Sequence, residues 1–320
     1  MKTVLQSETC SVYSVDGPDL RVLLASTPES RRICNDPLLY GVNYTEALKA
    51  ACARVLPHVG QDLEENQTSV VHLLRGGLNF GLREALALAF DWNAHSSTFL
   101  SAQRRRKDSN PQEWEIGECD YRKLAVPAKV CLVMGDVVAS GASLQYGIES
   151  MLQAISEQKK SLRSILFFTI GGPRTEEVFR ALDGRIRTEH PEYEGTTVVY
   201  FEGRFPVAGL QTTLSIKITG TDLLRHGQDL TPEFVNSQYE SPMFPVERCT
   251  IYDAGSRAFE PDVYLQDVVE YWESVSKLSG LSYQDYLKER FPGLDAKRFT
   301  GVDSLKALAE QQLDRLRAFL

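Results

Sequence analysis

Short apolar runs alternate along the chain with stretches in which apolar residues recur every three or four positions. The runs at 69–74, 129–134, 163–170 and 196–202 have the length and the β-branched or aromatic content of buried strands. Helical spacing follows each of the first three runs. This alternation predicts a parallel α/β sheet with right-handed crossover connections.

Two other segments in the first half of the chain have clear patterns. Residues 44–56 carry apolar side chains at helical spacing, and Pro57 is expected to end that helix. Residues 97–103 and 114–119 are expected to form strands. They flank the hydrophilic stretch RRRKDSNPQE, so 97–119 is interpreted as a hairpin with a long mobile tip.

The last third of the chain changes character twice. Residues 205–260 are rich in Pro, Thr and Gly, and we expect irregular structure over the sheet. From Asp262 the pattern is helical again, and Asp303 is the expected N-cap of the last helix. The apolar side of that last helix consists of Leu305, Leu308, Leu313, Leu316 and Leu320.

Length and composition fit a folded protein with more than one part. The pattern divides the 320 residues into an N-terminal segment, 1–39, a main domain, 40–260, and a C-terminal helical region, 261–320. Hydrophobic residues are 42% and charged residues 24%, so disorder is not expected as the main state.

Charge and residue usage exclude several classes of function. The chain has 35 Lys+Arg against 43 Asp+Glu, a net charge of −8, which argues against nucleic-acid binding through phosphate neutralisation. No stretch approaches the ~18 apolar residues of a spanning helix, and the first residues lack the apolar run of a signal peptide. The six cysteines show no C-x-x-C spacing and are expected to be free thiols in a cytoplasmic protein. No metal-ligand spacing connects His58, His72, His95, His190 and His226.

The segment with the clearest chemistry is GDVVASGAS, residues 135–143, between a predicted strand and a predicted helix. Asp136 is placed where its carboxylate can accept hydrogen bonds from sugar hydroxyls. The helix that follows adds its positive end, and the hydroxyls of Ser140 and Ser143 can donate further bonds to phosphate oxygens. Small residues allow backbone N–H groups to converge on an anion, namely Ala139, Ser140, Gly141, Ala142 and Ser143.

The longer segment VCLVMGDVVASGAS resembles the phosphoribosyl pyrophosphate (PRPP) signature of type I phosphoribosyltransferases. It departs from the family pattern at Gly135, where the first of two acidic residues is usual. The resemblance implies a catalytic role for Asp136 at the ribose and binding of the 5-phosphate by Ala139 to Ser143. It also implies the type I fold, a parallel sheet flanked by helices with an irregular hood, here followed by a C-terminal helical extension.

Two basic segments match the family in their order along the chain. Arg75, Gly76 and Gly77 resemble the loop that binds the pyrophosphate of PRPP. The run from Arg104 to Lys107 falls where the family has its mobile catalytic loop. The resemblance implies that basic side chains of this run, with Arg104 and Arg105 as the catalytic candidates, pair with pyrophosphate oxygens.

Residues 252–259, YDAGSRAF, resemble the base-binding segment of uracil phosphoribosyltransferases. In that family, backbone groups of this segment contact the edge of the pyrimidine. The resemblance therefore implies base binding by Tyr252, Asp253, Ala254 and Gly255. By motif order it extends over about residues 40–260, and the C-terminal helices have no counterpart in it.

The implied reaction is displacement of pyrophosphate from PRPP by a ring nitrogen of a uracil-like or other base. Mg²⁺ is the implied cofactor, because it prefers substrate phosphates and water to protein-only ligand sets. A homodimer is expected. Three alternatives remain open: a regulator that senses PRPP or a nucleotide without turnover, an interaction protein that acts through its C-terminal helices, and a related displacement with a different acceptor.

Overall fold

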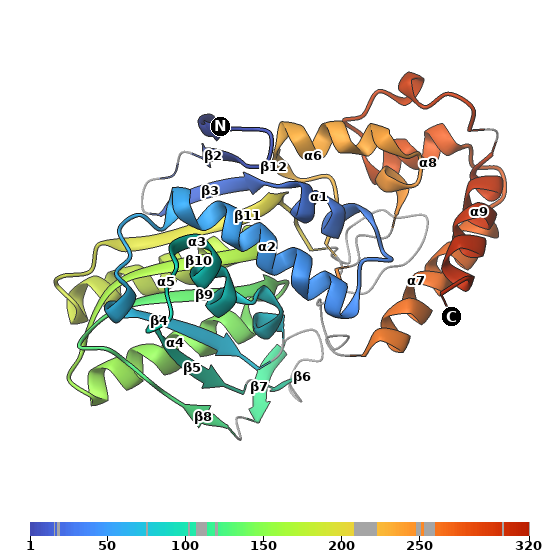
Figure 1. The fold of residues 1–320 in the computed structure, drawn as a ribbon. Coiled ribbons are helices and arrows are strands. Elements are labelled where there is room, and N and C mark those ends of the chain that lie inside the picture. Colours follow the sequence, from blue (N-terminus) through green and yellow to red (C-terminus); the bar gives the residue numbers. More distant parts are fainter. Residues whose placement is uncertain are drawn as a thin grey trace.

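A ten-stranded mixed sheet forms the centre of the computed structural model (Figure 1). The structure describes the chain except for residues 16, 18–19, 75, 102, 107–113, 119–120, 208–222, 248–250, 253–259, 303 and 320. The strand order is β1-β2-β3-β11-β10-β9-β4-β5-β8, and β12 pairs with β11. The six neighbouring strands from β3 to β5 in this order run parallel, and β1, β2, β8 and β12 pair antiparallel.

The predicted parallel α/β sheet is thereby confirmed for the six central strands, whereas β1, β2, β8 and β12 are antiparallel additions to it. The strands of the sheet are β1 (Lys2–Gln6), β2 (Ser11–Val15), β3 (Arg21–Ser26), β4 (Thr68–Leu73), β5 (Ser96–Leu100), β8 (Arg122–Lys123), β9 (Lys129–Val138), β10 (Ser161–Gly171), β11 (Gly195–Arg204) and β12 (Gln228–Leu230). All four predicted buried runs, at 69–74, 129–134, 163–170 and 196–202, lie in strands of this sheet.

Helices cover both faces of the sheet (Figure 1). The helices of the described residues are α1 (Pro28–Asn35), α2 (Gly41–Val59), α3 (Leu82–Phe90), α4 (Ala142–Glu157), α5 (Arg174–Glu189), α6 (Pro232–Ser237), α7 (Pro261–Ser276), α8 (Tyr283–Arg290) and α9 (Leu305–Arg317), of which α7, α8 and α9 lie beside the sheet. Short 3₁₀ turns are η1 (Glu65–Gln67), η2 (Gly76–Phe80), η3 (Gln238–Glu240), η4 (Phe244–Val246) and η5 (Ala296–Arg298).

Alternate residues of the central strands feed two separate hydrophobic cores, as the two-residue period of a strand requires. Val133 and Phe168 face the core that contains α1, α2 and α3. Met134 and Phe167 face the core under α4 and α5. The first core continues into the C-terminal helices through residues such as Trp272, so these helices pack on the same body as the sheet.

The helix predicted to end at Pro57 continues to Val59 and is followed by Gly60. The prediction was wrong because a proline in the last turn removes only its own hydrogen bond, while the apolar side continues past it. Val55, Leu56 and Val59 are all buried, and their packing holds the final turn in place.

The predicted 97–119 hairpin is divided between two sheets. Strand β5 belongs to the main sheet, whereas β6 (Gln103–Arg106) pairs antiparallel with β7 (Trp114–Glu118) in a two-stranded sheet of its own. The hairpin therefore exists, but its first strand begins at Gln103. The predicted mobile tip lies outside the described residues.

The C-terminal region is helical as predicted, with α7, α8 and α9. The N-cap of α9 is Ser304, whose hydroxyl accepts from the Ala307 N–H at 2.9 Å, and Asp303 lies outside the described residues. The stretch 205–260, expected to be irregular, contains the helix α6 and the strand β12 in its described part. The first 39 residues, expected to be a separate segment, supply β1, β2 and β3 to the main sheet.

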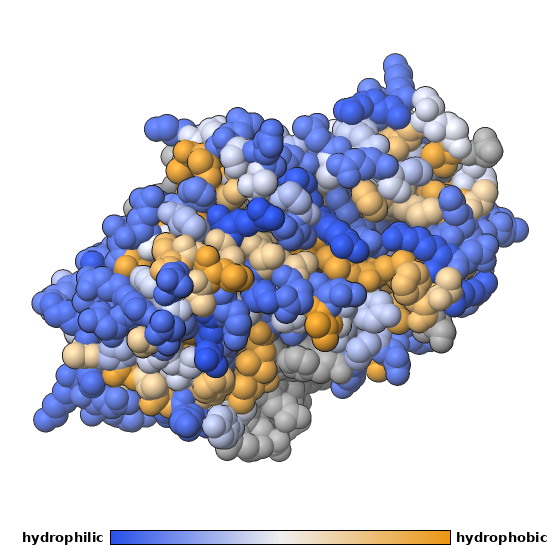
Figure 2. Space-filling model, in the orientation of Figure 1, coloured by the Kyte–Doolittle hydropathy of each residue, from blue (hydrophilic) through white to orange (hydrophobic). Residues whose placement is uncertain are grey.

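Four of the six cysteines are described, and all four are buried and free: Cys10, Cys34, Cys52 and Cys131. No helix in the described ranges is both long enough and apolar enough to cross a membrane. Figure 2 shows mostly hydrophilic residues at the margins of one face, with apolar residues gathered in a band across its middle.

Candidate functional site

The end of β9 and the loop after it form the centre of the candidate site. Strand β9 lies between β10 and β4, and Asp136 is in register with Thr169 of β10. Asp136 is half-buried, and its Oδ1 accepts from the Val137 N–H at 2.9 Å. Ala139, Ser140 and Gly141 then connect the strand to α4, at the carboxyl edge of the sheet where α/β proteins bind ligands.

Backbone N–H groups are available at the start of α4. Gly141 is the N-cap, with φ +77° and no side-chain cap, and the first turn holds no acidic residue. In the described part of the chain, no hydrogen bond leads from the N–H of Gly141, Ala142 or Ser143 to a protein acceptor. These groups and the positive end of a 16-residue helix together favour an anion.

The second glycine-rich segment lies against the first. A Cβ on Gly77 would lie 3.0 Å from the carbonyl oxygen of Gly135, so only a glycine lets η2 approach β9 this closely. The structure thus brings Gly76 and Gly77, at the start of η2, next to β9, the strand that contains Asp136. Arg75, predicted beside them, lies outside the described residues.

Gly135 has a structural reason to be glycine. A Cβ at this position would lie 2.5 Å from two ring atoms of Phe80, a fully buried residue at the end of η2. The position where the resembled family usually has its first acid is therefore filled by an aromatic ring. Asp136 alone remains of the acidic pair, and it lies on the opposite face of β9.

The residues present fit a Mg²⁺ ion that is held mainly through a substrate. The described residues contain no group of three or more His, Cys, Asp or Glu side chains that could hold a metal by themselves. Thr169 is fully buried beside Asp136 on the next strand, and its Oγ1 has no hydrogen-bond partner. One carboxylate and one such hydroxyl suit an ion whose other ligands are phosphate oxygens and water.

Arg174 is a residue of this site that the sequence reasoning missed. It is the first residue of α5, and its Nε donates to the carbonyl oxygen of Ser140 at 3.3 Å. Its Nη1 pairs with Glu177 at 2.7 Å, and about half of its side chain is exposed. The segment GGPRTEE gave no periodic or motif signal for this role, because only the fold brings α5 beside the loop.

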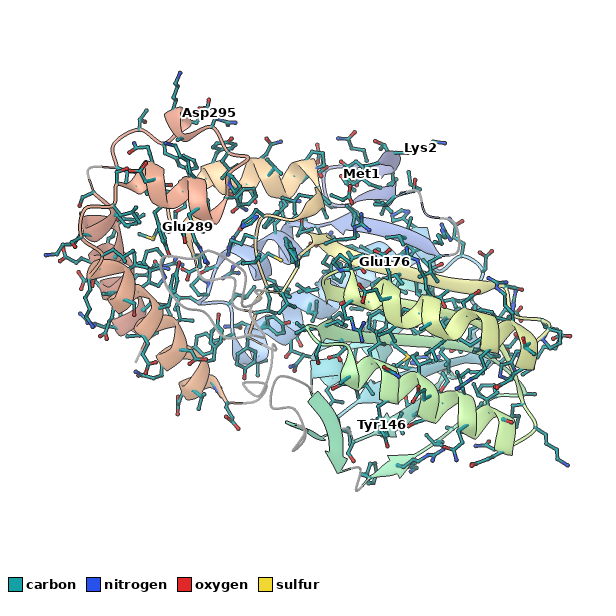
Figure 3. All side chains as sticks on the ribbon, turned by 180° about the vertical axis from the view of Figure 1, so that it is seen from behind. Met1, Lys2, Tyr146, Glu176, Glu289 and Asp295 are labelled. Atoms are coloured by element: carbon teal, nitrogen blue, oxygen red, sulfur yellow. The ribbon has the colours of Figure 1, made fainter. Side chains whose placement is uncertain are left out.

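A buried ion-pair network fixes the start of α5. Glu176 is 2% exposed and accepts from Arg204 at 2.9 Å and from Arg180 at 2.6 Å. Tyr200 donates to the Gly172 carbonyl at 3.2 Å, and burial raises the pKa of its hydroxyl. Figure 3 shows Glu176 at the start of α5, beside the sheet. The network connects α5 to β11 and so sets where Arg174 lies.

The predicted catalytic arginines lie on a strand. Arg104 and Arg105 belong to β6, where the register pairs them with Ile116 and Glu115 of β7. The β6–β7 hairpin approaches α4, so it lies on the same side of the molecule as the loop after β9. Lys107 lies outside the described residues.

Of the predicted base-binding segment, the structure describes Tyr252. Its ring is 3% exposed and packs edge-to-face on Tyr44 and Tyr264, with centroids 5.5 Å and 5.3 Å away. A role of Tyr252 in binding a base would therefore come from its backbone. Asp253, Ala254 and Gly255 lie outside the described residues.

No protein-family model matches the chain, and no curated protein matches it by sequence. Among solved structures, it is similar to a hypoxanthine phosphoribosyltransferase from Staphylococcus aureus, with 14% identity, coverage of 50% of this chain and 76% of that one, and a TM-score of 0.30. A hypoxanthine-guanine phosphoribosyltransferase from Bacillus anthracis gives 17% identity, coverage of 40% and 69%, and a TM-score of 0.28.

The corresponding enzyme from L. donovani gives 18% identity, coverage of 50% and 82%, and a TM-score of 0.30. TM-scores this low carry no argument about this chain. The account of the site therefore depends on the residues and geometry of the chain itself.

Proposed function

We propose that the protein transfers the 5-phosphoribosyl group of PRPP to a ring nitrogen of a base and releases pyrophosphate. The observation that carries the proposal is the arrangement at the end of β9. There, Asp136 is followed by a loop of small residues, and the N–H groups of Gly141 to Ser143 have no acceptor among the described residues. The glycine turn at Gly76 and Gly77 packs against the same strand. A sugar that carries a phosphate at one end and pyrophosphate at the other needs groups of these kinds.

Each group then has a part in binding. The N–H groups of Gly141 to Ser143 hold the 5-phosphate, with hydroxyls of Ser140 and Ser143 as further donors. Asp136 accepts from the ribose hydroxyls and orients the ring. Backbone N–H groups at Gly76 and Gly77, with Arg75, face the pyrophosphate. Mg²⁺, when bound with the substrate, supplies charge neutralisation at the pyrophosphate oxygens.

In the reaction, the bond from the anomeric carbon to the pyrophosphate oxygen breaks, and a bond from that carbon to the base nitrogen forms. The pyrophosphate leaves with the electron pair of the broken bond, and the proton of the ring nitrogen passes to the pyrophosphate or to water. The chain supplies no nucleophile, so its contribution is positioning, charge stabilisation and exclusion of water. Arg104 and Arg105 are proposed to pair with the departing pyrophosphate, and backbone groups of Tyr252 to Gly255 to hold the base. A uracil-like ring is the first acceptor to test.

The test is a pyrophosphate-release assay with PRPP, Mg²⁺ and a panel of free pyrimidine and purine bases. Release that depends on one base supports the transferase and identifies its acceptor. Asp136→Asn removes the carboxylate at the ribose and should lower kcat/KM roughly 10- to 100-fold, the usual effect of losing a charged hydrogen-bond partner. No release with any base, from protein that binds PRPP, would contradict the transferase proposal.

A second candidate, a regulator that binds PRPP without turnover, is favoured by one observation. Phe80 occupies the space beside Gly135, so the chain has no room for the first acid of the usual pair. Binding of PRPP without pyrophosphate release would support this candidate. The type I fold, the homodimer and the cytoplasmic location accompany the main proposal as further predictions.

A further inference from the structure

Arg174, at the start of α5, contacts the loop after β9, which is the proposed phosphate site. Its Nε–H donates to the Ser140 carbonyl at 3.3 Å, and a Cβ on Gly141 would lie 3.2 Å from the Arg174 Cγ. The side chain therefore lies along Ser140 and Gly141, whose shared peptide group carries the first N–H of the predicted anion site.

The stability of α5 does not explain why an arginine occupies position 174. A cation at the first position of a helix opposes the helix dipole, whereas Glu176 and Glu177 in the same turn complement it. The pair of Arg174 with Glu177 is between two half-exposed side chains three residues apart, and pairs of this kind contribute little. The contact that remains to account for the position of Arg174 is the one with the Ser140 carbonyl.

That contact fixes the direction of one N–H group. The described residues contain no cis peptide bond, so the Ser140 C=O and the Gly141 N–H, which share a planar trans peptide, point in opposite directions. Because Arg174 holds the carbonyl toward α5, the Gly141 N–H points away from α5. This is one of the N–H groups that have no protein acceptor.

We propose that Arg174 is a positioning residue for the 5-phosphate of PRPP. It orients the Ser140–Gly141 peptide so that the Gly141 N–H donates to the phosphate, and it brings a positive charge next to the loop. The buried network around Glu176 keeps α5 in the place that this contact requires. This inference rests on the proposed function, because it assigns a residue to the same site.

The test uses two ligands that separate the two ends of the substrate. Calorimetric titration with ribose 5-phosphate reports on the loop after β9, and titration with pyrophosphate reports on the Gly76–Gly77 turn. Arg174→Ala should weaken ribose 5-phosphate binding roughly three- to ten-fold, the range for losing one net hydrogen bond, and should leave pyrophosphate binding unchanged. In steady state, the KM for PRPP should rise by the same factor while kcat stays constant.

Two further variants serve as controls. Arg174→Lys keeps a donor for the Ser140 carbonyl and should retain most of the ribose 5-phosphate affinity. Arg185→Ala removes another exposed arginine of α5, paired with Glu189 at 3.4 Å, and should change neither titration. Thermal melting of Arg174→Ala should match that of the wild type, since the arginine does not stabilise its helix.

Wild-type affinity of Arg174→Ala for ribose 5-phosphate would overturn the inference and leave the proposed function intact. Equal weakening of both ligands, or an equal effect of Arg185→Ala, would also overturn it. If the wild-type protein binds neither ligand, the proposed function itself fails, and the inference fails with it.

Discussion

The backbone N–H groups at the start of α4 differ from those at the start of α8 and α9 in whether side chains cap them. At α4, a glycine occupies the N-cap, and within the described ranges the first N–H groups have no protein acceptor. At α8 and α9, the hydroxyls of Ser282 and Ser304 accept from the backbone N–H three residues later, at 3.1 Å and 2.9 Å. Uncapped N–H groups cost stability unless water or a ligand satisfies them. The N–H groups of α4 are therefore open to the proposed phosphate, whereas side chains satisfy those of α8 and α9.

The interior of the C-terminal region shows the same closure. The buried carboxylate of Glu247 accepts from the Trp272 Nε1 at 2.8 Å and from the Gln312 Nε2 at 2.9 Å. It connects α7 and α9 to the segment that follows η4. At the carboxyl edge of the sheet, by contrast, the buried Thr169 Oγ1 and the first N–H groups of α4 have no acceptor or donor among the described residues.

The largest expected effect is on PRPP binding at the start of α4. Gly141→Val places a branched side chain at φ +77°, against Val178 and Arg174, and disturbs the N–H groups of the loop. Loss of two charge-assisted hydrogen bonds should weaken PRPP binding roughly a thousand-fold, measured by calorimetry.

Gly301→Val is the matched control for that variant. Gly301 has the same φ of +77° with nothing within 4 Å of an added Cβ, so it carries the backbone strain without the site. It should bind PRPP like the wild type. Equal losses in the two variants would show that strain, and not the loop, is responsible.

A substitution in the C-terminal helical region should change the stability of the protein and not its affinity for PRPP. Glu247→Ala leaves the Trp272 and Gln312 donors buried without this acceptor and should lower the free energy of unfolding by about 2–5 kcal/mol, measured by urea denaturation. Glu270→Ala removes an exposed glutamate of α7, whose recorded contact is with Gln266, and should change stability by less than about 0.5 kcal/mol. If folded Glu247→Ala protein bound PRPP more weakly than the wild type, the C-terminal region would contribute to binding, contrary to the contrast drawn with the start of α4.

A smaller effect is expected where the two glycine turns meet. Gly135→Ala forces a Cβ against the Phe80 ring and should lower the free energy of unfolding by about 1–3 kcal/mol, measured by urea denaturation. Gly184→Ala, in an exposed and open position of α5, should instead stabilise the protein by roughly 0.5–1 kcal/mol. A neutral Gly135→Ala would show that this position has room for the missing acid.

A pH dependence of stability is expected from the buried carboxyl group of Glu202, near the end of β11. Burial raises the pKa of Glu202 from 4.5 to about 7, against hydrogen bonds from hydroxyls including Thr231. Because the folded protein then binds this proton more tightly than the unfolded chain, the contribution of Glu202 to stability is complete below pH 4.5. It falls as pH rises to about 7, by roughly 1.4 kcal/mol per pH unit at most.

The measurement for Glu202 is the difference in unfolding free energy between the wild type and Glu202→Gln across pH 4.5 to 7. The wild-type value should fall steadily relative to the Glu202→Gln value toward higher pH, because glutamine does not titrate. The difference isolates Glu202 from His72, whose pKa burial lowers to about 4 and whose effect on stability has the opposite sign over most of this window. A constant difference would mean that Glu202 does not titrate there.

Patterns that depend on one element could be predicted from the sequence. The apolar runs of β4, β9, β10 and β11, and the small-residue loop before α4, follow from local periodicity and residue size. Features that depend on two distant elements could not. The approach of Phe80 to Gly135 and the contact of Arg174 with Ser140 each join segments whose packing no local pattern encodes. Pro57 was misread because the burial of Val59 outweighs the proline signal.

The most direct test of the account is calorimetric titration of the whole protein with PRPP in the presence of Mg²⁺. The account predicts saturable binding that Gly141→Val abolishes and Gly301→Val preserves. Absence of heat with PRPP, under conditions where the protein is folded by circular dichroism, would contradict the assignment of the loop after β9 as a phosphate site.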